Sequence, residues 1–196
     1  MEIAEAAVPV CDVSVFQLKN FESVFAQVLE EFLSCSGKWR HSHKIGGRWE
    51  NTYPPIEQVP SVRSILSLAA TVGTRSYGSN LVCGHGILKD SFWFNQMDMG
   101  EGTGWHDHKA KAALSGVCYL KVPRHSGDFL YQNASCAEQA ITPGEGMLLL
   151  FPPTLRHAVA SSQSPHTRIS LAFNLFTLPL EMGADDPFGG HSLMRG

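Results

Sequence analysis

The apolar pattern of the chain changes its period at about Ser91, and this change constrains the fold more than any other feature. Before that position, apolar residues recur every three or four residues, as in amphipathic helices. After it, short stretches alternate between apolar and polar residues, and turns rich in glycine and proline separate them. The expected strands are 91–98, 103–109, 114–121, 128–133, 138–141, 146–151, 156–161 and 167–176. Eight short strands without intervening helices predict a mainly β fold of the α+β class, either a sandwich or a barrel.

The N-terminal part is expected to support this sheet with two helices on one outer face. A short strand at 13–16 precedes a helix that begins after Asn20 as its N-cap and ends near Gly37. Its apolar stripe has spacings of three and four: Phe21, Val24, Phe25, Val28, Leu29, Phe32 and Leu33. A second helix is expected over 61–72, with a buried face made of Val62, Ile65, Leu66 and Ala69. The segment 37–60 between them is rich in glycine, proline and polar residues, which predicts a long surface connection.

The length of 196 residues is enough for one domain with a sizeable core. We therefore expect a single domain over 1–196, with a support region at 1–90 and the β core at 91–176. The glycine- and proline-containing tail at 181–196 is expected to be loosely held.

Charge and cysteine usage limit the partners and the location of the protein. The net charge is −3, the pI is about 6.3, and no segment concentrates lysine and arginine, so nucleic acid is not expected as the main partner. No apolar run is long enough to predict a membrane span, and the first ten residues do not resemble a secretory signal. The five cysteines are scattered without a Cys-x-x-Cys pair, as is typical of reduced thiols. We expect an intracellular, cytoplasmic protein whose oligomeric state is open.

Three histidines stand in contexts that favour metal binding. His106 and His108 are two residues apart in an expected strand, so their side chains would share a face and could ligate one ion. His157 follows four predicted strands later, where a sheet that folds back can return the chain. Imidazoles suit iron, zinc, copper and nickel, and an open facial arrangement suits iron(II). The alternative is hydrogen-bonded or surface histidines, as we expect for His41 and His43 in the polar connection.

The last predicted strand has two different faces. One face carries apolar core residues: Ile169, Leu171, Phe173 and Leu175. The other carries small or polar residues: Arg168, Ser170, Ala172 and Asn174. A guanidinium can bind a carboxylate through two parallel hydrogen bonds, and a neighbouring hydroxyl can complete the site. A dicarboxylate that chelates a metal at one end would therefore meet Arg168 at the other. The alternative is a surface arginine paired with an acid.

The chain resembles the 2-oxoglutarate/iron(II)-dependent oxygenases of bacteria and phages in five segments that occur in the same order: 93–95, 106–108, 114–120, 151–159 and 168–174. The resemblance covers roughly residues 91–176. It implies a double-stranded β-helix, or jelly roll, that requires iron(II), 2-oxoglutarate and O2 and releases succinate and CO2. It also implies that His106, His108 and His157 hold the iron, and that Arg168 and Ser170 bind the 5-carboxylate of 2-oxoglutarate. Ascorbate is expected to support activity in vitro.

One departure from the superfamily concerns the second metal ligand, because His108 stands where an aspartate or glutamate is usual. In a regular strand the side chain of Asp107 would point away from those of His106 and His108. We therefore expect a three-histidine site in which Asp107 does not bind the metal but orients one of the imidazoles. A bulge would change the parity and make Asp107 the second ligand instead.

Three further residues are candidates for the cosubstrate site. Asn95 and Tyr119 could hydrogen-bond the carboxylates of 2-oxoglutarate, and Asn174 could line the floor of the pocket. For Tyr119 the alternative is a core tyrosine with its hydroxyl at the rim.

The sequence therefore predicts a 2-oxoglutarate-dependent dioxygenase, an oxidoreductase that hydroxylates or otherwise oxidises a substrate that the sequence does not identify. Two alternatives stay open: a cupin-type three-histidine dioxygenase that needs no 2-oxoglutarate, and a jelly-roll module that binds metal without catalysis.

Overall fold

The computed structural model describes residues 1–10, 13–35, 39–45, 48–85, 88, 91–108, 112–132 and 134–180, with only the backbone at 2–10, 43–45 and 48. In this part of the chain the helices are α1 (Glu22–Ser34) and α2 (Val62–Tyr77). The strands are β1 (Glu2–Val10), β2 (Val13–Lys19), β3 (Arg40–Ile45), β4 (Arg48–Tyr53), β5 (Leu81–Val82), β6 (Phe92–Met97), β7 (Thr103–His106), β8 (Leu114–Lys121), β9 (Phe129–Gln132), β10 (Glu138–Ile141), β11 (Met147–Phe151), β12 (His157–Val159) and β13 (Arg168–Thr177). The expected tail at 181–196 lies outside the described residues.

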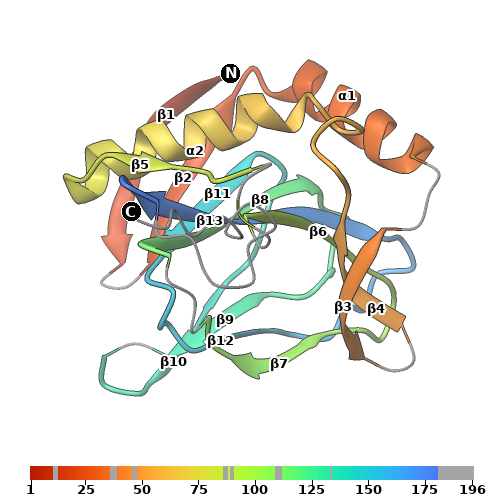
Figure 1. The fold of residues 1–196 in the computed structure, drawn as a ribbon. Coiled ribbons are helices and arrows are strands. Elements are labelled where there is room, and N and C mark those ends of the chain that lie inside the picture. The colour runs from red at the N-terminus through yellow and green to blue at the C-terminus, as the bar shows by residue number, and fades with distance from the viewer. Residues whose placement is uncertain are drawn as a thin grey trace, which may run out of the picture.

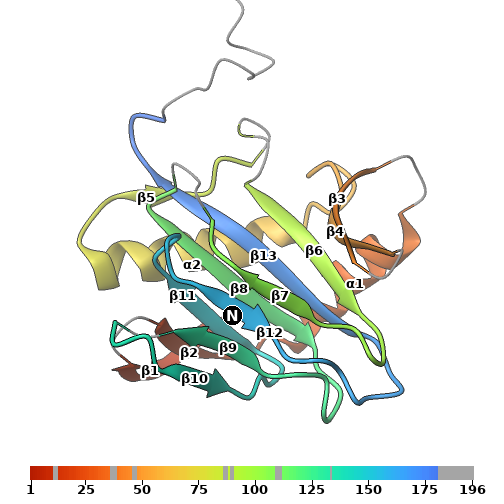
Figure 2. The same cartoon turned by 90° about the horizontal axis from the view of Figure 1, so that it is seen from below.

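The strands form two antiparallel sheets that face each other (Figure 1). The larger sheet has the order β1-β2-β11-β8-β13-β6-β4-β3, with β5 paired to β13, and the smaller sheet has the order β10-β9-β12-β7. From β6 to β13 the chain passes back and forth between the two sheets, as Figure 2 shows from the side of the smaller one. This alternation is that of a jelly roll, so the fold class predicted from the sequence is confirmed.

The eight predicted strands of the core all exist, and the largest differences in length, three residues each, are in two of them. Strand β7 ends at His106 rather than at residue 109, and β12 covers only His157–Val159 rather than 156–161. Both differences lie beside the candidate metal ligands, where the backbone leaves the regular ladder.

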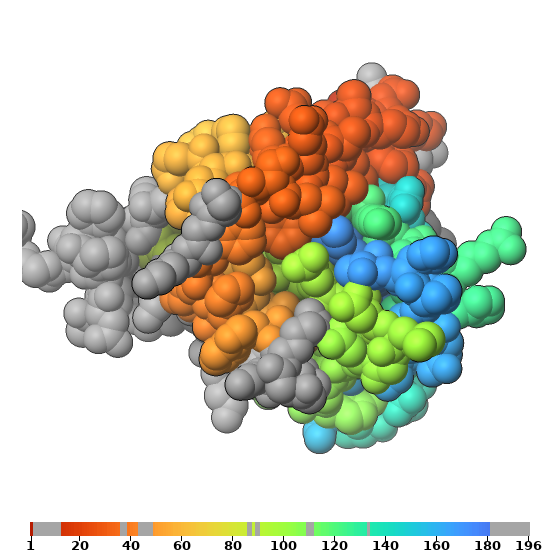
Figure 3. All heavy atoms as spheres, turned by 90° about the vertical axis from the view of Figure 1, so that its right-hand side faces the viewer, coloured from red at the N-terminus to blue at the C-terminus, as the bar shows by residue number. Residues whose placement is uncertain are grey.

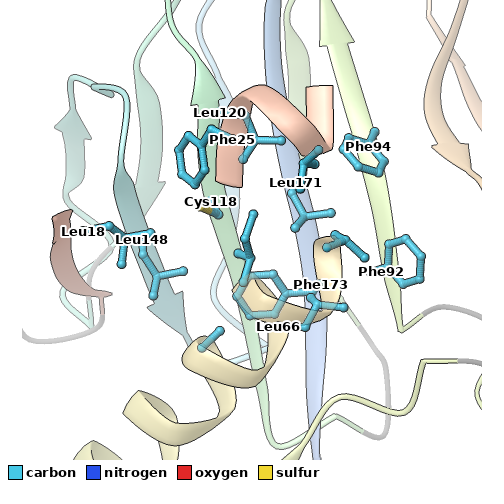
Figure 4. Close-up of a cluster of buried hydrophobic side chains, with 14 of the residues drawn as sticks. Leu18, Phe25, Leu66, Phe92, Phe94, Cys118, Leu120, Leu148, Leu171 and Phe173 are labelled. Atoms are coloured by element: carbon cyan, nitrogen blue, oxygen red, sulfur yellow. The ribbon is translucent and has the colours of Figure 1, made fainter. Parts of the chain in front are cut away.

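Helices α1 and α2 cover the outer face of the larger sheet (Figure 1). Figure 4 shows the contact: Phe25 of α1 and Leu66 of α2 point toward a layer of sheet side chains that includes Phe94, Leu171 and Phe173. Burial of these apolar side chains is the main favourable contribution to the stability of the domain. Because the helices fill the outer face, only the inner face of the sheet can line a cavity.

Strand β13 shows how the sequence pattern divides these two faces. Ile169, Leu171, Phe173 and Leu175 are buried in the core beneath the helices. The alternate side chains line a cavity on the inner face: Arg168, Ser170, Ala172 and Asn174. The predicted alternation thus corresponds to the two sides of the sheet.

The ends of both helices differ from the prediction. Helix α1 has Phe21 as its N-cap without a side-chain cap, and Asn20 instead adopts a left-handed backbone with φ of 53°. Asparagine tolerates this conformation better than most residues, so it serves the turn into the helix rather than the cap. Helix α2 continues five residues beyond the expected 72 and ends at Gly78, whose φ of 70° is the left-handed conformation common at helix C-termini. The predicted end near Gly37 lies outside the described residues.

The prediction of a long surface connection at 37–60 is wrong. The segment contains the β3–β4 hairpin, and β4 joins the larger sheet through the pair Asn51 and Asn95. Figure 3 views the molecule from this side and shows the hairpin's orange atoms below those of α1. The aromatic and β-branched residues Trp49, Thr52 and Tyr53 favour a strand, and pairing with β6 overrides the polar composition of the segment.

Two further predictions concerned the cysteines and membrane-spanning segments. Cys35, Cys83, Cys118 and Cys136 are free thiols, and Cys11 lies outside the described residues. In the described part of the chain, neither helix is long and apolar enough to span a membrane.

Candidate active site

A cavity of about 680 Å³ lies between the two sheets. Its lining comes from both sheets, including β4, β6, β8 and β13 of the larger one and β7 and β12 of the smaller one. The volume is in the range of small-molecule sites. The cavity contains every candidate site residue that the sequence analysis named: Asn95, His106, Asp107, His108, Tyr119, His157, Arg168, Ser170 and Asn174.

His106, His108 and His157 form a cluster at this cavity. One ring nitrogen of each lies within 4.8 Å of those of the other two. The rings of His106 and His157 are 4.2 Å apart at their centroids, because these residues are direct partners in the β7–β12 ladder. Three imidazoles with nitrogens this close match the donor set of a divalent transition metal.

Hydrogen bonds at Nδ1 fix the tautomer of two of the rings. Nδ1 of His106 donates to the carbonyl oxygen of Gly104 at 2.8 Å, and Nδ1 of His157 donates to that of Leu155 at 2.8 Å. A carbonyl oxygen can only accept, so Nδ1 carries the proton in both rings and the lone pair of Nε2 is left for a metal.

His108 is held by a chain of side chains from the opposite sheet. The Ser115 hydroxyl donates to Oδ1 of Asn174 at 2.8 Å, so it accepts from Nδ1 of His108 at 3.0 Å. This relay orients the third imidazole in the same way as the carbonyls orient the other two. The sequence analysis placed Asn174 at the pocket but did not find Ser115. Strand parity was the available signal, because Ser115 shares a face of β8 with Tyr119.

The reason given for pairing His106 with His108 needs correction. Strand β7 ends at His106, so the two side chains do not share a face by regular strand alternation. The chain turns instead, and the backbone N–H of His108 donates to the carbonyl of Pro153 at 2.8 Å. This contact with the loop before β12 brings His108 beside His157.

The pKa of His157 keeps its imidazole neutral. Burial lowers this pKa to about 3, and the neighbouring His106 acts in the same direction. A neutral ring can ligate a metal at physiological pH without first losing a proton, which favours binding.

Asp107 lies at the edge of the cavity and is exposed. The cluster of metal-ligating groups among the described residues consists of the three histidines and does not include it. The geometry therefore favours His108 over Asp107 as the second ligand.

The second His-x-His pair has a different environment. The His41 ring is exposed, contacts Oγ1 of Thr52 at 3.3 Å and stacks against Trp49 with centroids 6.1 Å apart. The side chain of His43 lies outside the described residues. His41 is thus a surface residue of the β3–β4 hairpin.

Arg168 is buried in the cavity wall at 3% exposure. Its Nη1 donates to the carbonyl oxygens of Ser126 at 3.0 Å and Gly127 at 2.8 Å, which fixes the guanidinium in place. The group lies 5.8 Å from the centre of the Tyr119 ring. Burial lowers the pKa of Arg168, while Tyr119 and Glu50 act in the opposite direction. A guanidinium stays charged in proteins, so it presents a fixed positive charge to the cavity.

The cross-strand partners of Ser170 complete this wall. Ser170 pairs with Asn95 of β6 and with Tyr119 of β8, so the three side chains are neighbours around the same part of the sheet. Burial raises the pKa of Tyr119 to about 12, and its phenol therefore remains a hydrogen-bond donor at neutral pH. Asn95 donates to Oδ1 of Asn51 at 2.6 Å, and this contact ties it to the β3–β4 hairpin.

The hairpin contributes residues that the sequence analysis missed. Glu50, Asn51 and Tyr53 of β4 line the cavity, and the Thr103 hydroxyl donates to Glu50. The aromatic residues Trp49 and Tyr53 and the β-branched Thr52 were the signal that could have identified a strand here.

We expect Ser115→Ala to weaken metal binding by about 10–100-fold, because His108 loses the acceptor that holds its ring. The dissociation constant of Zn(II), measured by chelator competition, tests this. Ser91→Ala is the matched control, since its hydroxyl is buried outside the cavity lining and donates to the Leu88 carbonyl. Equal zinc affinity in both folded variants would show that the relay does not orient the ligand.

The chain is similar to a known protein family and to several solved structures. A family model described as "Putative 2OG-Fe(II) oxygenase" matches residues 128–174, a segment that includes His157, Arg168 and Ser170. No curated protein gives a significant match to the chain.

Several solved structures share the fold. A 2OG-Fe(II) oxygenase family oxidoreductase from Burkholderia pseudomallei is 14% identical, with a TM-score of 0.61 over 85% of this chain and 86% of that one. A Pseudomonas putida prolyl-4-hydroxylase is 15% identical, with a TM-score of 0.62 over 85% of this chain and 92% of that one. A Trichoplax adhaerens prolyl hydroxylase, solved with a peptide fragment of hypoxia inducible factor, is 17% identical, with a TM-score of 0.64 over 86% and 84%. The jelly-roll fold and the resemblance stated from the sequence are confirmed.

Proposed function

We propose that this relative of the 2OG-Fe(II) oxygenases is a dioxygenase that uses non-haem iron(II), 2-oxoglutarate and O2 to hydroxylate or otherwise oxidise a substrate. The observation that carries the proposal is one cavity that joins three convergent imidazoles to a buried guanidinium. The family match supports the same activity, because it spans the third histidine and the arginine.

The three imidazoles fit iron(II). Their Nδ1 atoms are committed to Gly104, Ser115 and Leu155, so the same nitrogen of each ring, Nε2, is left to ligate. Three protein ligands leave coordination positions for a cosubstrate and O2. When bound, iron(II) with 2-oxoglutarate supplies the activation of O2 that oxidises a substrate C–H bond, with release of succinate and CO2.

Arg168 and Ser170 bind the 5-carboxylate of 2-oxoglutarate in this proposal. The guanidinium donates to one carboxylate through charge-assisted hydrogen bonds, and the Ser170 hydroxyl adds a further donor. Tyr119 and Asn95, the cross-strand neighbours of Ser170, add donors beside it. Asn174 acts differently, since its amide oxygen fixes Ser115 and through it His108.

The cavity walls exclude water from the reacting groups. His157 packs against the rings of Phe129 and Phe151, with centroids 5.5 and 5.0 Å away. A dry wall on this side strengthens the electrostatic contacts inside and limits side reactions.

The test is turnover of 2-oxoglutarate by the purified protein. With iron(II) and ascorbate we expect succinate to form, slowly in the absence of substrate, and a chelator to stop the reaction. N-oxalylglycine, a 2-oxoglutarate analogue, should raise the melting temperature of the metal-loaded protein.

Two other results would contradict the proposal. Consumption of O2 with a thiol or diketone substrate, without a thermal shift from N-oxalylglycine, would identify a cupin-type dioxygenase. Tight metal retention with neither turnover nor binding of the analogue would identify a non-catalytic binding module.

A further inference from the structure

Glu50 is a buried carboxylate in the wall of the same cavity. It is 9% exposed and comes from β4, the strand that the hairpin adds to the edge of the jelly roll beside β6. Removing a carboxylate from water is costly unless the protein or a ligand replaces its hydration. Glu50 therefore needs compensation from its surroundings.

The protein supplies only part of this compensation. The Thr103 hydroxyl donates to Oε1 of Glu50. Among the described residues, Glu50 makes no ion pair within 4 Å, although Arg168 is near enough to interact with it electrostatically. A carboxylate accepts about four hydrogen bonds, so a neutral hydroxyl leaves most of its capacity for a ligand.

The charges along the cavity indicate which kind of ligand this is. Apart from the histidines, the charged side chains of the described lining are Glu50, Asp107 and Arg168. The charge of +2 on iron(II) and that of −2 on 2-oxoglutarate cancel when both are bound. Glu50, Asp107 and Arg168 together then carry a net charge of −1, so the space left for a second molecule is favourable for a cation.

Aromatic rings also line this cavity. Tyr53 of β4 and Trp93 of β6 lie with ring centroids 5.9 Å apart, and both belong to the cavity lining. The Tyr53 ring already stacks against the Arg40 guanidinium, 3.6 Å from its centre. One face of Tyr53 is thus already paired with a cation. The faces of such rings attract cations, so a substrate cation would contact Trp93 or the other face of Tyr53, in addition to Glu50.

We propose that the substrate oxidised by this protein is a small molecule with a cationic nitrogen, an ammonium or guanidinium group, and that Glu50 binds that nitrogen. The inference rests on the proposed function, because it assigns Arg168 to 2-oxoglutarate. A volume of about 680 Å³ accommodates a cosubstrate and a small substrate together.

The experiment compares three probes of similar shape: benzylammonium, benzyl alcohol and benzoate. Their affinities for the full chain loaded with Zn(II) and N-oxalylglycine are measured by ligand-observed NMR. We expect benzylammonium to bind at least ~10-fold more tightly than the other two, as a charge-assisted hydrogen bond provides. With Mn(II) in place of Zn(II), the methylene protons of benzylammonium should relax faster, which locates the probe beside the metal centre.

Glu50→Gln should reduce the preference for benzylammonium over benzyl alcohol to less than ~3-fold. Glu101→Gln is the matched control, because it removes the same charge from a residue outside the cavity lining, whose carboxylate accepts from the N–H of Asp98. The control should keep the preference, and a melting curve checks that both variants are folded.

Two outcomes would overturn the inference. The first is a wild-type protein without preference for the cation, a result that does not depend on the folding of any variant. The second is a preference that persists in folded Glu50→Gln. If that variant also loses affinity for N-oxalylglycine, Glu50 serves as the counter-ion of Arg168 instead. Failure of N-oxalylglycine to bind the wild-type protein would instead contradict the proposed function. The affinity of the wild-type protein for N-oxalylglycine is therefore measured separately.

Discussion

His157→Ala is expected to abolish succinate formation and to weaken metal binding by more than the ~100-fold that loss of an outer hydrogen-bond partner costs. His157 is the central member of the cluster, because its ring lies 4.2 Å from that of His106 and 5.0 Å from that of His108. Its removal leaves two imidazoles, of which only His106 lies on a strand. The variant also loses the buried ring that packs against Phe129 and Phe151.

Two measurements separate these effects. Chelator competition gives the affinity for Zn(II), and a melting curve of the metal-free protein shows whether the variant is folded. His166→Ala is the matched control, since His166 is exposed on the loop before β13 and should leave both quantities unchanged. Wild-type metal affinity in folded His157→Ala would remove this residue from the metal centre.

Arg168→Ala is expected to weaken 2-oxoglutarate binding strongly while leaving metal affinity within ~3-fold of the wild type. Truncating one partner of a buried, hydrogen-bonded charge pair costs about 2–5 kcal/mol, which corresponds to ~30-fold or more in affinity. The effect should be specific, because the hydrogen bonds of the guanidinium go to the carbonyls of Ser126 and Gly127 rather than to the histidines.

Calorimetry with N-oxalylglycine and Mn(II)-loaded protein measures this loss. Arg168→Lys keeps the charge but not the planar fork, so it should recover only part of the affinity. Arg124→Ala removes a positive charge from the exposed part of the same loop as Ser126 and serves as the control. Equal affinity in wild type and folded Arg168→Ala would show that the carboxylate binds elsewhere.

The contrast between β13 and β4 shows what kind of pattern the sequence reveals. In β13 the apolar side chains alternate strictly with the others, so both the core face and the cavity face could be predicted from parity. In β4 the residues Glu50, Asn51 and Thr52 are all buried although all are polar, because the cavity and the neighbouring strands supply their contacts. No local pattern indicates burial of this kind.

The metal centre likewise combines features that the sequence predicts with features that it does not. The sequence indicated which three histidines to group, but the regular strand assumed for His106 and His108 ends between them. A turn held by the Pro153 carbonyl places His108, and Ser115 from another strand orients it. These contacts join residues that are far apart in the chain, so spacing alone could not predict them.

By itself, the sequence determined a mainly β sandwich or barrel, the helical cover of one sheet and the grouping of three histidines with Arg168. Each of these follows from periodicity or from residue chemistry in fixed order along the chain, whereas the jelly roll was implied by the family resemblance. Only the tertiary structure decided that His108 rather than Asp107 joins the cluster, that β4 lines the cavity, and that Glu50 faces the same cavity as Arg168. The physical reason is that side-chain direction in a turn and burial of a polar group are set by partners across the fold, not by neighbours in sequence.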